Sequence, residues 1–169
     1  MRAAIFLDRD GVINHDPGDY TKHLDEFHVL PTVMEALRKF VDGGFDLVII
    51  TNQGGIAKGL YSHAEVAAIH AHLERLCEAN GTPLLGIYYS PHHPDYGASL
   101  SRKPGCLMIE RACARYGIDP SRSWMIGDKP RDLEAGAGAG VQGVLMPVNG
   151  ELTQVADRIL STFQPQPHV

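Results

Sequence analysis

Two aspartates separated by a single residue, Asp8 and Asp10, directly follow an apolar run at residues 3–7. On a tight turn, one carboxylate can act as a nucleophile or metal ligand, and the other as a general acid and base. Two other interpretations compete here. An isolated D-x-D pair is most often a surface feature, and a calcium loop of this type would need a preceding helix and a glutamate where this chain has Asp19. The position after an apolar run favours a site in a crevice.

Further polar segments could bind an anionic group. Residues 51–54 offer a hydroxyl, two amides and backbone N–H groups, which donate hydrogen bonds without adding negative charge. Two adjacent cations precede an expected helix at residue 104, whose N-terminus also favours an anion. A fourth polar segment, at residues 127–132, adds Asp128 and Lys129. The residues of all these segments are Thr51, Asn52, Gln53, Gly54, Arg102, Lys103, Asp128 and Lys129. Taken alone, residues 51–54 favour a polar turn and the two adjacent cations favour solvated surface charge. A helix cap on a surface turn would explain Asp132.

Short apolar runs alternate with amphipathic segments along the chain. The runs predict strands, each buried on both faces, at residues 3–7, 45–50, 84–90, 123–126 and 141–146. The amphipathic segments predict helices at residues 31–42, from a capping box at 62–65 onward, from residue 104, at about 130–139 and at about 151–163. This alternation indicates an α/β fold, a three-layer, doubly wound parallel sheet. Ligands in such folds bind at the carboxyl ends of the strands, where the polar segments are expected to meet.

The length and composition limit the number of domains that the chain can form. A chain of 169 residues has room for one domain, expected over residues 1–163 with a flexible tail at 164–169. The sheet and its helices use nearly all of it, so we expect no separate cap domain. The long loops at 14–30 and 91–103 must then provide the substrate contacts. Hydrophobic residues at 44% and charged residues at 21% exclude a disordered chain.

Net charge and cysteine usage bear on partners and compartment. The formal net charge of −5 offers no basic surface, so neither a nucleic acid nor a membrane is expected as a partner. The apolar stretch at residues 5–7 is far too short for a signal peptide or a membrane span, and we expect a cytoplasmic monomer. Cys77, Cys106 and Cys113 form no C-x-x-C pair and are predicted to be small buried hydrophobic residues.

The charges of the candidate site require a cation. Each of Asp8, Asp10 and Asp128 would repel a phosphate dianion by roughly 4 kcal/mol per pair of charges at about 4 Å and an effective dielectric near 20. Lys103 and a divalent cation would turn this net repulsion of the phosphate into attraction. Oxygen ligands together with a phosphate substrate indicate Mg²⁺.

Four segments in order, FLDRDGVIN, TNQGGIAKG, RKP and IGDKPRD, resemble the motifs of the haloacid dehalogenase superfamily, over residues 5–146. FLDRDGVIN, TNQGGIAKG, IYYSPHHP and SRKP are similar to the D-glycero-D-manno-heptose 1,7-bisphosphate phosphatases and the related histidinol-phosphate phosphatases. The resemblance implies a Mg²⁺-dependent phosphatase that removes the 7-phosphate of this small sugar bisphosphate, in bacterial nucleotide-heptose synthesis for the lipopolysaccharide core. The alternatives are a histidinol-phosphate phosphatase and a non-catalytic phosphate-binding protein of the same fold.

The resemblance also implies a role for each matching residue. Asp8 would attack phosphorus and become a phosphoaspartate, while Asp10 would protonate the leaving alkoxide and later deprotonate water, a contribution of about 10² to 10⁴ in rate. Thr51 and Lys103 would hold the transferring phosphoryl group. Mg²⁺ would be bound by the Asp8 side chain, the Asp10 backbone carbonyl and Asp128. The substrate contacts would be Asp16, Pro17, Gly18, Asp19, Asn52, Gln53, Gly54, Arg102, Lys103 and Lys129.

The long loop departs from the family pattern. Members often carry a structural zinc held by C-x-H and C-x-C-R-K-P segments, where this chain has Ser90-Pro91-His92 and Ser99-Leu100-Ser101. Neutral serine hydroxyls are poor zinc ligands. We therefore predict no structural zinc, and expect hydrogen bonds and prolines to hold the loop.

Overall fold

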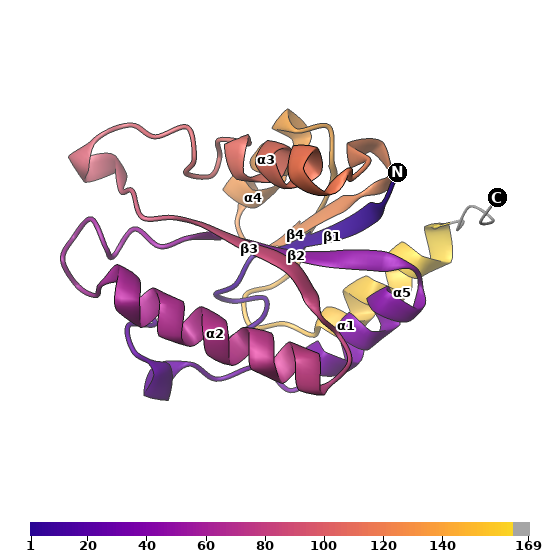
Figure 1. Ribbon diagram of the computed structural model, residues 1–169, viewed down its shortest axis with the longest axis horizontal. Coiled ribbons are helices and arrows are strands. Elements are labelled where there is room, and N and C mark those ends of the chain that lie inside the picture. The colour runs from indigo at the N-terminus through magenta and orange to yellow at the C-terminus, as the bar shows by residue number, and fades with distance from the viewer. Residues whose placement is uncertain (164–169) are drawn as a thin grey trace.

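The computed structural model describes residues 1–163, so the tail expected at 164–169 lies outside the described residues. A five-stranded sheet with the order β3-β2-β1-β4-β5 forms its centre, and every neighbouring pair is parallel (Figure 1). The strands are β1 (Ala3–Leu7), β2 (Phe45–Asn52), β3 (Leu84–Ser90), β4 (Trp124–Gly127) and β5 (Gln142–Leu145). The predicted α/β fold with a parallel sheet is confirmed.

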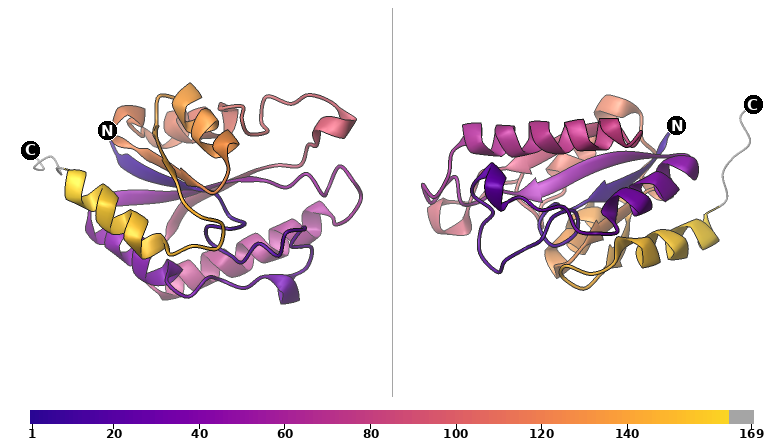
Figure 2. Two further views of the ribbon diagram at one scale, coloured as in Figure 1. Left: turned by 180° about the vertical axis from the view of Figure 1, so that it is seen from behind. Right: turned by 90° about the horizontal axis from the view of Figure 1, so that it is seen from below.

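Helices cover both faces of this sheet, which gives three layers. The helices are α1 (Val33–Asp42), α2 (His63–Ala79), α3 (Leu107–Tyr116), α4 (Pro130–Gly138) and α5 (Leu152–Thr162). Helices α1, α2 and α5 lie on one face, and α3 and α4 on the other (Figures 1 and 2). No helix within residues 1–163 is both long enough and apolar enough to cross a bilayer.

The central strand β1 serves both cores because its side chains alternate between the two faces. Ile5 and Leu7 belong to the core cluster under α1, α2 and α5, whereas Ala4 and Phe6 belong to the cluster under α3 and α4. All five residues of β1 are buried. Asp8, the next residue, is therefore placed by a strand that packing holds on both sides.

Two helix starts show how local chemistry set the boundaries. The capping box predicted for α2 is present, since Ser62 N donates to Glu65 Oε2 at 2.7 Å and Glu65 N donates to Ser62 Oγ at 3.3 Å. Helix α3 begins at Leu107 rather than at residue 104, so that prediction was wrong. The Gly105 N–H is used in a turn to Arg102 O at 2.8 Å, and the helical ladder starts only at the Cys106 carbonyl.

The predicted burial was wrong at the sheet edges and for two cysteines. Along β5, Val144 is buried but Leu145 is 50% exposed, and β3 is mostly half-buried. An edge strand has a neighbour on one side alone, so helices on the two faces leave part of it in contact with water. Cys77 is buried as predicted, whereas Cys106, which precedes α3, and Cys113 are partly exposed.

Candidate active site

The predicted chemistry-bearing residues meet at the carboxyl edge of the sheet. Asp8 extends β1, and its N–H donates to Ile126 O of β4 at 3.0 Å. Thr51 lies at the end of β2, and Asp128 directly follows β4. Lys103 reaches the same edge at the end of the loop that leaves β3, and it is almost fully buried. The strand order therefore unites residues that lie far apart in the sequence.

The floor of the site is a buried ionic cluster around the Lys103 ammonium. Lys103 Nζ lies 2.9 Å from Asp8 Oδ1, 2.6 Å from Asp132 Oδ1 and 2.8 Å from Ile50 O. Its backbone is held by Asn52, which donates to Lys103 O and accepts from Lys103 N, both at 3.0 Å. Lys103 is thus a buried, paired cation, and the alternative of a solvated surface charge is wrong.

Three carboxylates of this floor have the chemistry of a divalent-cation site. Asp8, Asp128 and Asp132 each offer an oxygen, and these atoms lie within 4.8 Å of one another. Such hard oxygen donors fit Mg²⁺, which takes a few carboxylates and keeps several waters. Asp8 contacts Lys103 through Oδ1 and Asp128 contacts Lys129 through Oδ2, so each has a second oxygen to offer a cation, whereas both oxygens of Asp132 have partners in the protein. The donor set therefore fits the expected metal.

Asp132 was missed as a member of this cluster. It does cap α4, because Lys129 N donates to Asp132 Oδ2 at 3.0 Å, but it is fully buried and pairs with Lys103 rather than lying on a surface turn. A sequence signal was present in its position four residues after Asp128, across a helix start that Pro130 marks.

Burial dominates the protonation of Asp8. Desolvation raises its pKa to about 7; Lys103 opposes this rise, and the negative charges of Asp132 and Asp10 add to it. A divalent cation beside Asp8 would favour the ionised carboxylate, which is the nucleophilic form. The charge of the Asp8 carboxylate thus depends on the cations beside it.

Asp10 lies in a different environment, surrounded by hydrogen-bond donors. Its carboxylate accepts from Arg9 Nη2 at 2.9 Å, from Asn14 Nδ2 at 2.9 Å and from Gln53 Nε2 at 3.0 Å. Burial would raise the pKa of Asp10, but Arg9 and these hydrogen bonds outweigh it and lower the pKa. Arg9 itself is fully buried, with Nη1 3.3 Å from His70 Nε2. Asp10 is therefore held in its ionised form.

The amides after β2 are near the site, and their polar atoms already have partners. Gln53 donates to Thr51 Oγ1 at 2.9 Å and to Asp10, and it accepts from the Tyr61 hydroxyl at 2.8 Å. Asn52 holds the Lys103 backbone. Both amides therefore position other site groups.

The rim of the site consists of loop residues and cations. Asp16 is half-buried, whereas Pro17, Gly18 and Asp19 are exposed. Lys129 Nζ lies 2.7 Å from Asp128 Oδ2 and 3.9 Å from Asp16 Oδ2.

Two further cations of the rim, Arg102 and Arg131, come from the long loop and from α4. Arg102 donates to His92 O at 2.8 Å, and a Cβ at Gly54 would lie 3.0 Å from its Nη1. Arg131, which was not among the predicted site residues, acts electrostatically on both Arg102 and Lys129, and its buried Nε has no hydrogen-bond partner within residues 1–163. The signal for Arg131 was its place in the IGDKPRD segment.

The three serines of the long loop lie together. Ser90 Oγ is 3.1 Å from Ser101 Oγ, which is 2.9 Å from Ser99 Oγ. These hydroxyls join the end of β3 to the far end of the loop, immediately before Arg102 and Lys103.

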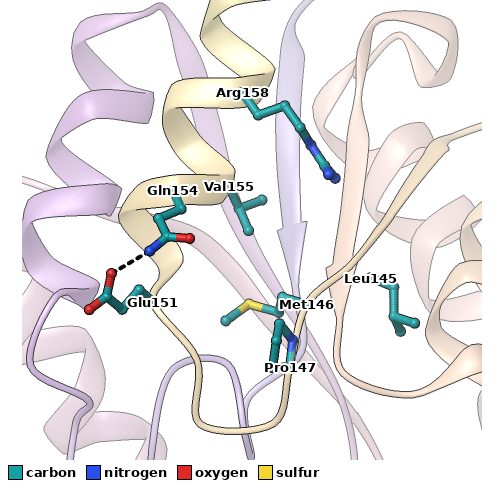
Figure 3. A pocket seen from close by; sticks show the side chains of 7 residues that line it. All are labelled: Leu145, Met146, Pro147, Glu151, Gln154, Val155 and Arg158. Carbon is teal, nitrogen blue, oxygen red and sulfur yellow. Dashed lines mark hydrogen bonds between the residues drawn. The ribbon is translucent and has the colours of Figure 1, made fainter.

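A separate pocket of about 460 Å³ lies between the end of β5 and the start of α5 (Figure 3). None of the predicted site residues lines it. Its lining residues are Leu145, Met146, Pro147, Glu151, Gln154, Val155 and Arg158.

The fold and the floor cluster define a class of protein, the phosphoric monoester hydrolases of the haloacid dehalogenase type. The HAD-hydrolase-like family profile matches residues 100–167. The D-glycero-beta-D-manno-heptose-1,7-bisphosphate 7-phosphatase of Pseudomonas aeruginosa is 41% identical over 145 residues, 86% of this chain and 81% of that protein. The protein of the same name from Haemophilus influenzae is 38% identical over 179 residues, 100% of this chain and 97% of its own length.

A solved structure agrees with these relatives. The D,D-heptose 1,7-bisphosphate phosphatase of B. bronchiseptica, crystallised with magnesium and phosphate, matches with a TM-score of 0.84 and 32% identity, over 95% of this chain and 99% of that chain. The chain belongs to the same family as these phosphatases, within the haloacid dehalogenase-like hydrolases. The resemblance inferred from the motifs is confirmed.

Proposed function

We propose that this chain is a Mg²⁺-dependent phosphatase that removes the 7-phosphate of D-glycero-D-manno-heptose 1,7-bisphosphate through a phosphoaspartate. The observation that carries the proposal is the floor cluster, in which Asp8 lies 2.9 Å from Lys103 and within 4.8 Å of further carboxylates. This geometry supports the proposal that a nucleophile, a fixed cation and a divalent-cation site lie together at one strand end. The names of the relatives supply the substrate class.

In the first step, an Asp8 carboxylate oxygen forms a bond to phosphorus as the bond from phosphorus to the sugar oxygen breaks. Asp10 gives its proton to the leaving alkoxide. A phosphoryl group bound beside Asp10 raises the pKa of that carboxyl by like-charge repulsion, which offsets the Arg9 contact and allows it to hold this proton. Thr51 and Lys103 hold the phosphoryl oxygens, where transition-state charge is spread.

In the second step, water attacks the phosphorus of the phosphoaspartate. The ionised Asp10 accepts a proton from this water, and the bond between phosphorus and the Asp8 oxygen breaks to release inorganic phosphate. Its donors Arg9, Asn14 and Gln53 favour this basic form of Asp10. One carboxylate thereby serves as acid and then as base.

The residues proposed to hold Mg²⁺ are the Asp8 side chain, the Asp10 backbone carbonyl and Asp128, with Asp132 supporting them from its ion pair with Lys103. The bound ion supplies positive charge that offsets the carboxylates and the phosphoryl oxygens. It also keeps Asp8 ionised, against the effect of burial on its pKa.

The cations of the rim favour a bisphosphate over histidinol phosphate. Arg131 acts electrostatically on both Arg102 and Lys129, and burial together with Arg131 lowers the pKa of Arg102. A second phosphate would relieve this repulsion, whereas the ammonium group of histidinol phosphate would add to it. The polar loop from Asp16 to Asp19, whose side chains and backbone can bond hydroxyls, is proposed to contact the sugar.

One set of phosphate-release assays tests this proposal. The specificity constant kcat/KM is measured on heptose 1,7-bisphosphate and on histidinol phosphate, each with Mg²⁺ and with excess chelator. We expect preference for the bisphosphate and loss of turnover on chelation. A preference for histidinol phosphate would contradict the heptose assignment, and an absence of hydrolysis on both would favour a phosphate-binding protein.

Assembly and compartment complete the proposal. All the catalytic groups named above come from one chain, so a monomer with a single domain over residues 1–163 suffices for the reaction, and we propose that it is cytoplasmic. Size-exclusion chromatography with light scattering tests the monomer, since a dimer would give twice the mass of 18.4 kDa.

A further inference from the structure

Asn149, in the loop between β5 and α5, has a backbone conformation that sets it apart. Its φ of 57° makes it the one non-glycine residue within residues 1–163 that adopts a positive φ. Asparagine tolerates this left-handed region better than most residues, because its short side chain can hydrogen-bond locally. Here the side chain bonds instead to a distant segment.

The bonds of Asn149 join three segments near the catalytic floor. Asp16 N donates to Asn149 Oδ1 at 2.7 Å, and Asn149 Nδ2 donates to Asp16 O at 2.9 Å. The backbone N–H of Asn149 donates to Gly11 O at 2.9 Å. One residue thus ties the loop at 14–19 to the turn that carries Asp10 and to the end of β5.

The side chain of Asp16 continues this connection toward the metal-binding carboxylates. Asp16 Oδ1 accepts from Gly18 N at 2.8 Å, and Asp16 Oδ2 lies 3.9 Å from Lys129 Nζ. Lys129 in turn lies 2.7 Å from Asp128 Oδ2. The backbone of Asp16 is held by Asn149, and its carboxylate is thereby presented to Lys129.

On one side of Asp16 the loop is held by His15 N, which donates to His28 O at 2.9 Å, and on the other side Asp19 Oδ2 lies 3.4 Å from Lys22 Nζ at the surface. Pro17, Gly18 and Asp19 are exposed, and Gly18 has a φ of 85°. An exposed loop of this kind samples many conformations unless main-chain groups are tied down. The paired bonds from Asn149 satisfy both main-chain groups of Asp16 in one geometry.

We propose that Asn149 is a positioning residue that holds the loop at 14–19 ready for the sugar of the substrate. Without its amide, binding has to order the loop, so substrate affinity falls while the chemistry at Asp8 proceeds as before. The inference rests on the proposed function, because it takes the loop at 14–19 to contact the sugar.

The test compares variants that separate backbone from side-chain effects. Asn149→Gly retains the left-handed backbone and removes both amide bonds. Asn149→Asp keeps the acceptor for Asp16 N and loses the donor to Asp16 O. Gln154→Ala is the matched control, because this nearby side chain bonds to Glu151 and not to the loop.

Two readouts are measured on each folded variant. Amide hydrogen exchange over residues 12–22 is expected to quicken at least about fivefold in Asn149→Gly. The KM for heptose 1,7-bisphosphate is expected to rise roughly 5- to 30-fold with kcat within about twofold, consistent with the loss of two hydrogen bonds. Asn149→Asp, whose second carboxylate oxygen would face Asp16 O in place of the amide donor, should show at least as large a change, Gln154→Ala none, and hydrolysis of p-nitrophenyl phosphate, which has no sugar, should be unchanged.

The outcomes separate this inference from the proposed function. If Asn149→Gly exchanges and binds as the wild type does, the positioning role is overturned. If the wild-type protein fails to hydrolyse the heptose bisphosphate, the proposed substrate is wrong and the link from Asn149 to the sugar is overturned with it, while the exchange measurement still decides whether Asn149 orders the loop. A fall in kcat with KM unchanged would place Asn149 in the chemical step instead.

Discussion

The floor and the rim of the site differ in how far their charged side chains are buried. On the floor, the side chains of Lys103 and Asp132 are at most 1% exposed and pair at 2.6 Å. On the rim, the Lys129 side chain is 41% exposed and that of Asp19 is 65% exposed. Removing one partner of a buried ion pair leaves an uncompensated charge and costs about 3–5 kcal/mol, whereas an exposed pair is worth about 0–1 kcal/mol. We therefore expect floor residues to serve stability and chemistry together, and rim residues to serve recognition.

The largest effect is expected from the nucleophile. Asp8→Asn removes the attacking carboxylate but keeps the shape of the side chain, so turnover of heptose 1,7-bisphosphate should fall on the order of 10⁴-fold or more. Phosphate release with saturating Mg²⁺ measures this loss, and circular dichroism checks that the variant is folded. Retention of more than a few per cent of wild-type activity would exclude a phosphoaspartate at this position.

The floor should also dominate stability. Lys103→Met leaves the Asp8 and Asp132 carboxylates buried without their cation, so the free energy of unfolding should fall by about 3–5 kcal/mol. Lys129→Met, the rim counterpart, should cost less, about 1–3 kcal/mol, because Lys129 is itself 41% exposed although its partner Asp128 has a side chain that is 1% exposed. Urea denaturation without metal compares the two.

A second substitution checks that charge is the cause. Adding Asp132→Asn to Lys103→Met removes one unpaired carboxylate and should restore part of the lost stability. Equal destabilisation by Lys103→Met and Lys129→Met would contradict the division between floor and rim.

His70, packed beneath the floor against Arg9, should make stability depend on pH. Burial and then Arg9 lower its pKa from 6.5 to about 3. Between these values the unfolded chain binds a proton that the folded chain does not, so this residue lowers the unfolding free energy as pH falls, by up to about 1.4 kcal/mol per pH unit. Asp8 acts in the opposite direction, since its pKa is raised from 3.8 to about 7.

The comparison of wild type with His70→Gln isolates the histidine from Asp8. Urea midpoints at pH 8, 7, 6 and 5 should show the variant gaining stability relative to the wild type as pH falls below about 6.5. A difference that stays constant across this range would mean that His70 binds its proton equally in both states.

Substitution of a rim cation is expected to weaken substrate binding, with a smaller effect than the floor substitutions. Arg131→Gln removes one of the three neighbouring cations, so the KM for the bisphosphate should rise about 5- to 20-fold, equivalent to about 1–2 kcal/mol, with little change in kcat. Hydrolysis of p-nitrophenyl phosphate should be unaffected, and Arg111→Gln, an exposed position on α3, serves as the control. An equal loss on both substrates would move Arg131 from recognition to catalysis.

The smallest effect concerns the serine-held loop. We expect no stoichiometric zinc in the purified protein by elemental analysis, because the three hydroxyls bond to one another. Ser101→Ala removes the shared hydroxyl, so amide exchange over residues 91–101 should increase while global stability changes by about 1 kcal/mol or less. One zinc per chain would refute the predicted absence.

The sequence was most informative where the signal is local. The alternation of apolar runs with amphipathic segments predicted the parallel sheet, and that sheet necessarily brings Asp8, Thr51 and Asp128 to one edge, because each lies at or directly after the carboxyl end of a strand. Residue types and order within the four motifs were sufficient for the family. Side-chain periodicity and caps depend on neighbours a few residues away, so they can be read along the chain.

Contacts between distant segments had no such signal. The burial of Asp132 depends on where the loop from β3 places Lys103, and the bond between Asp16 and Asn149 joins residues 133 apart. The start of α3, the exposure of Leu145 and that of Cys106 depend likewise on which segments happen to lie alongside. The amino-acid order thus specified the sheet and the reacting groups at its edge. Only the tertiary structure decided which groups pair with them, because the interaction energy of a buried charge or main-chain group depends on the groups that packing brings next to it.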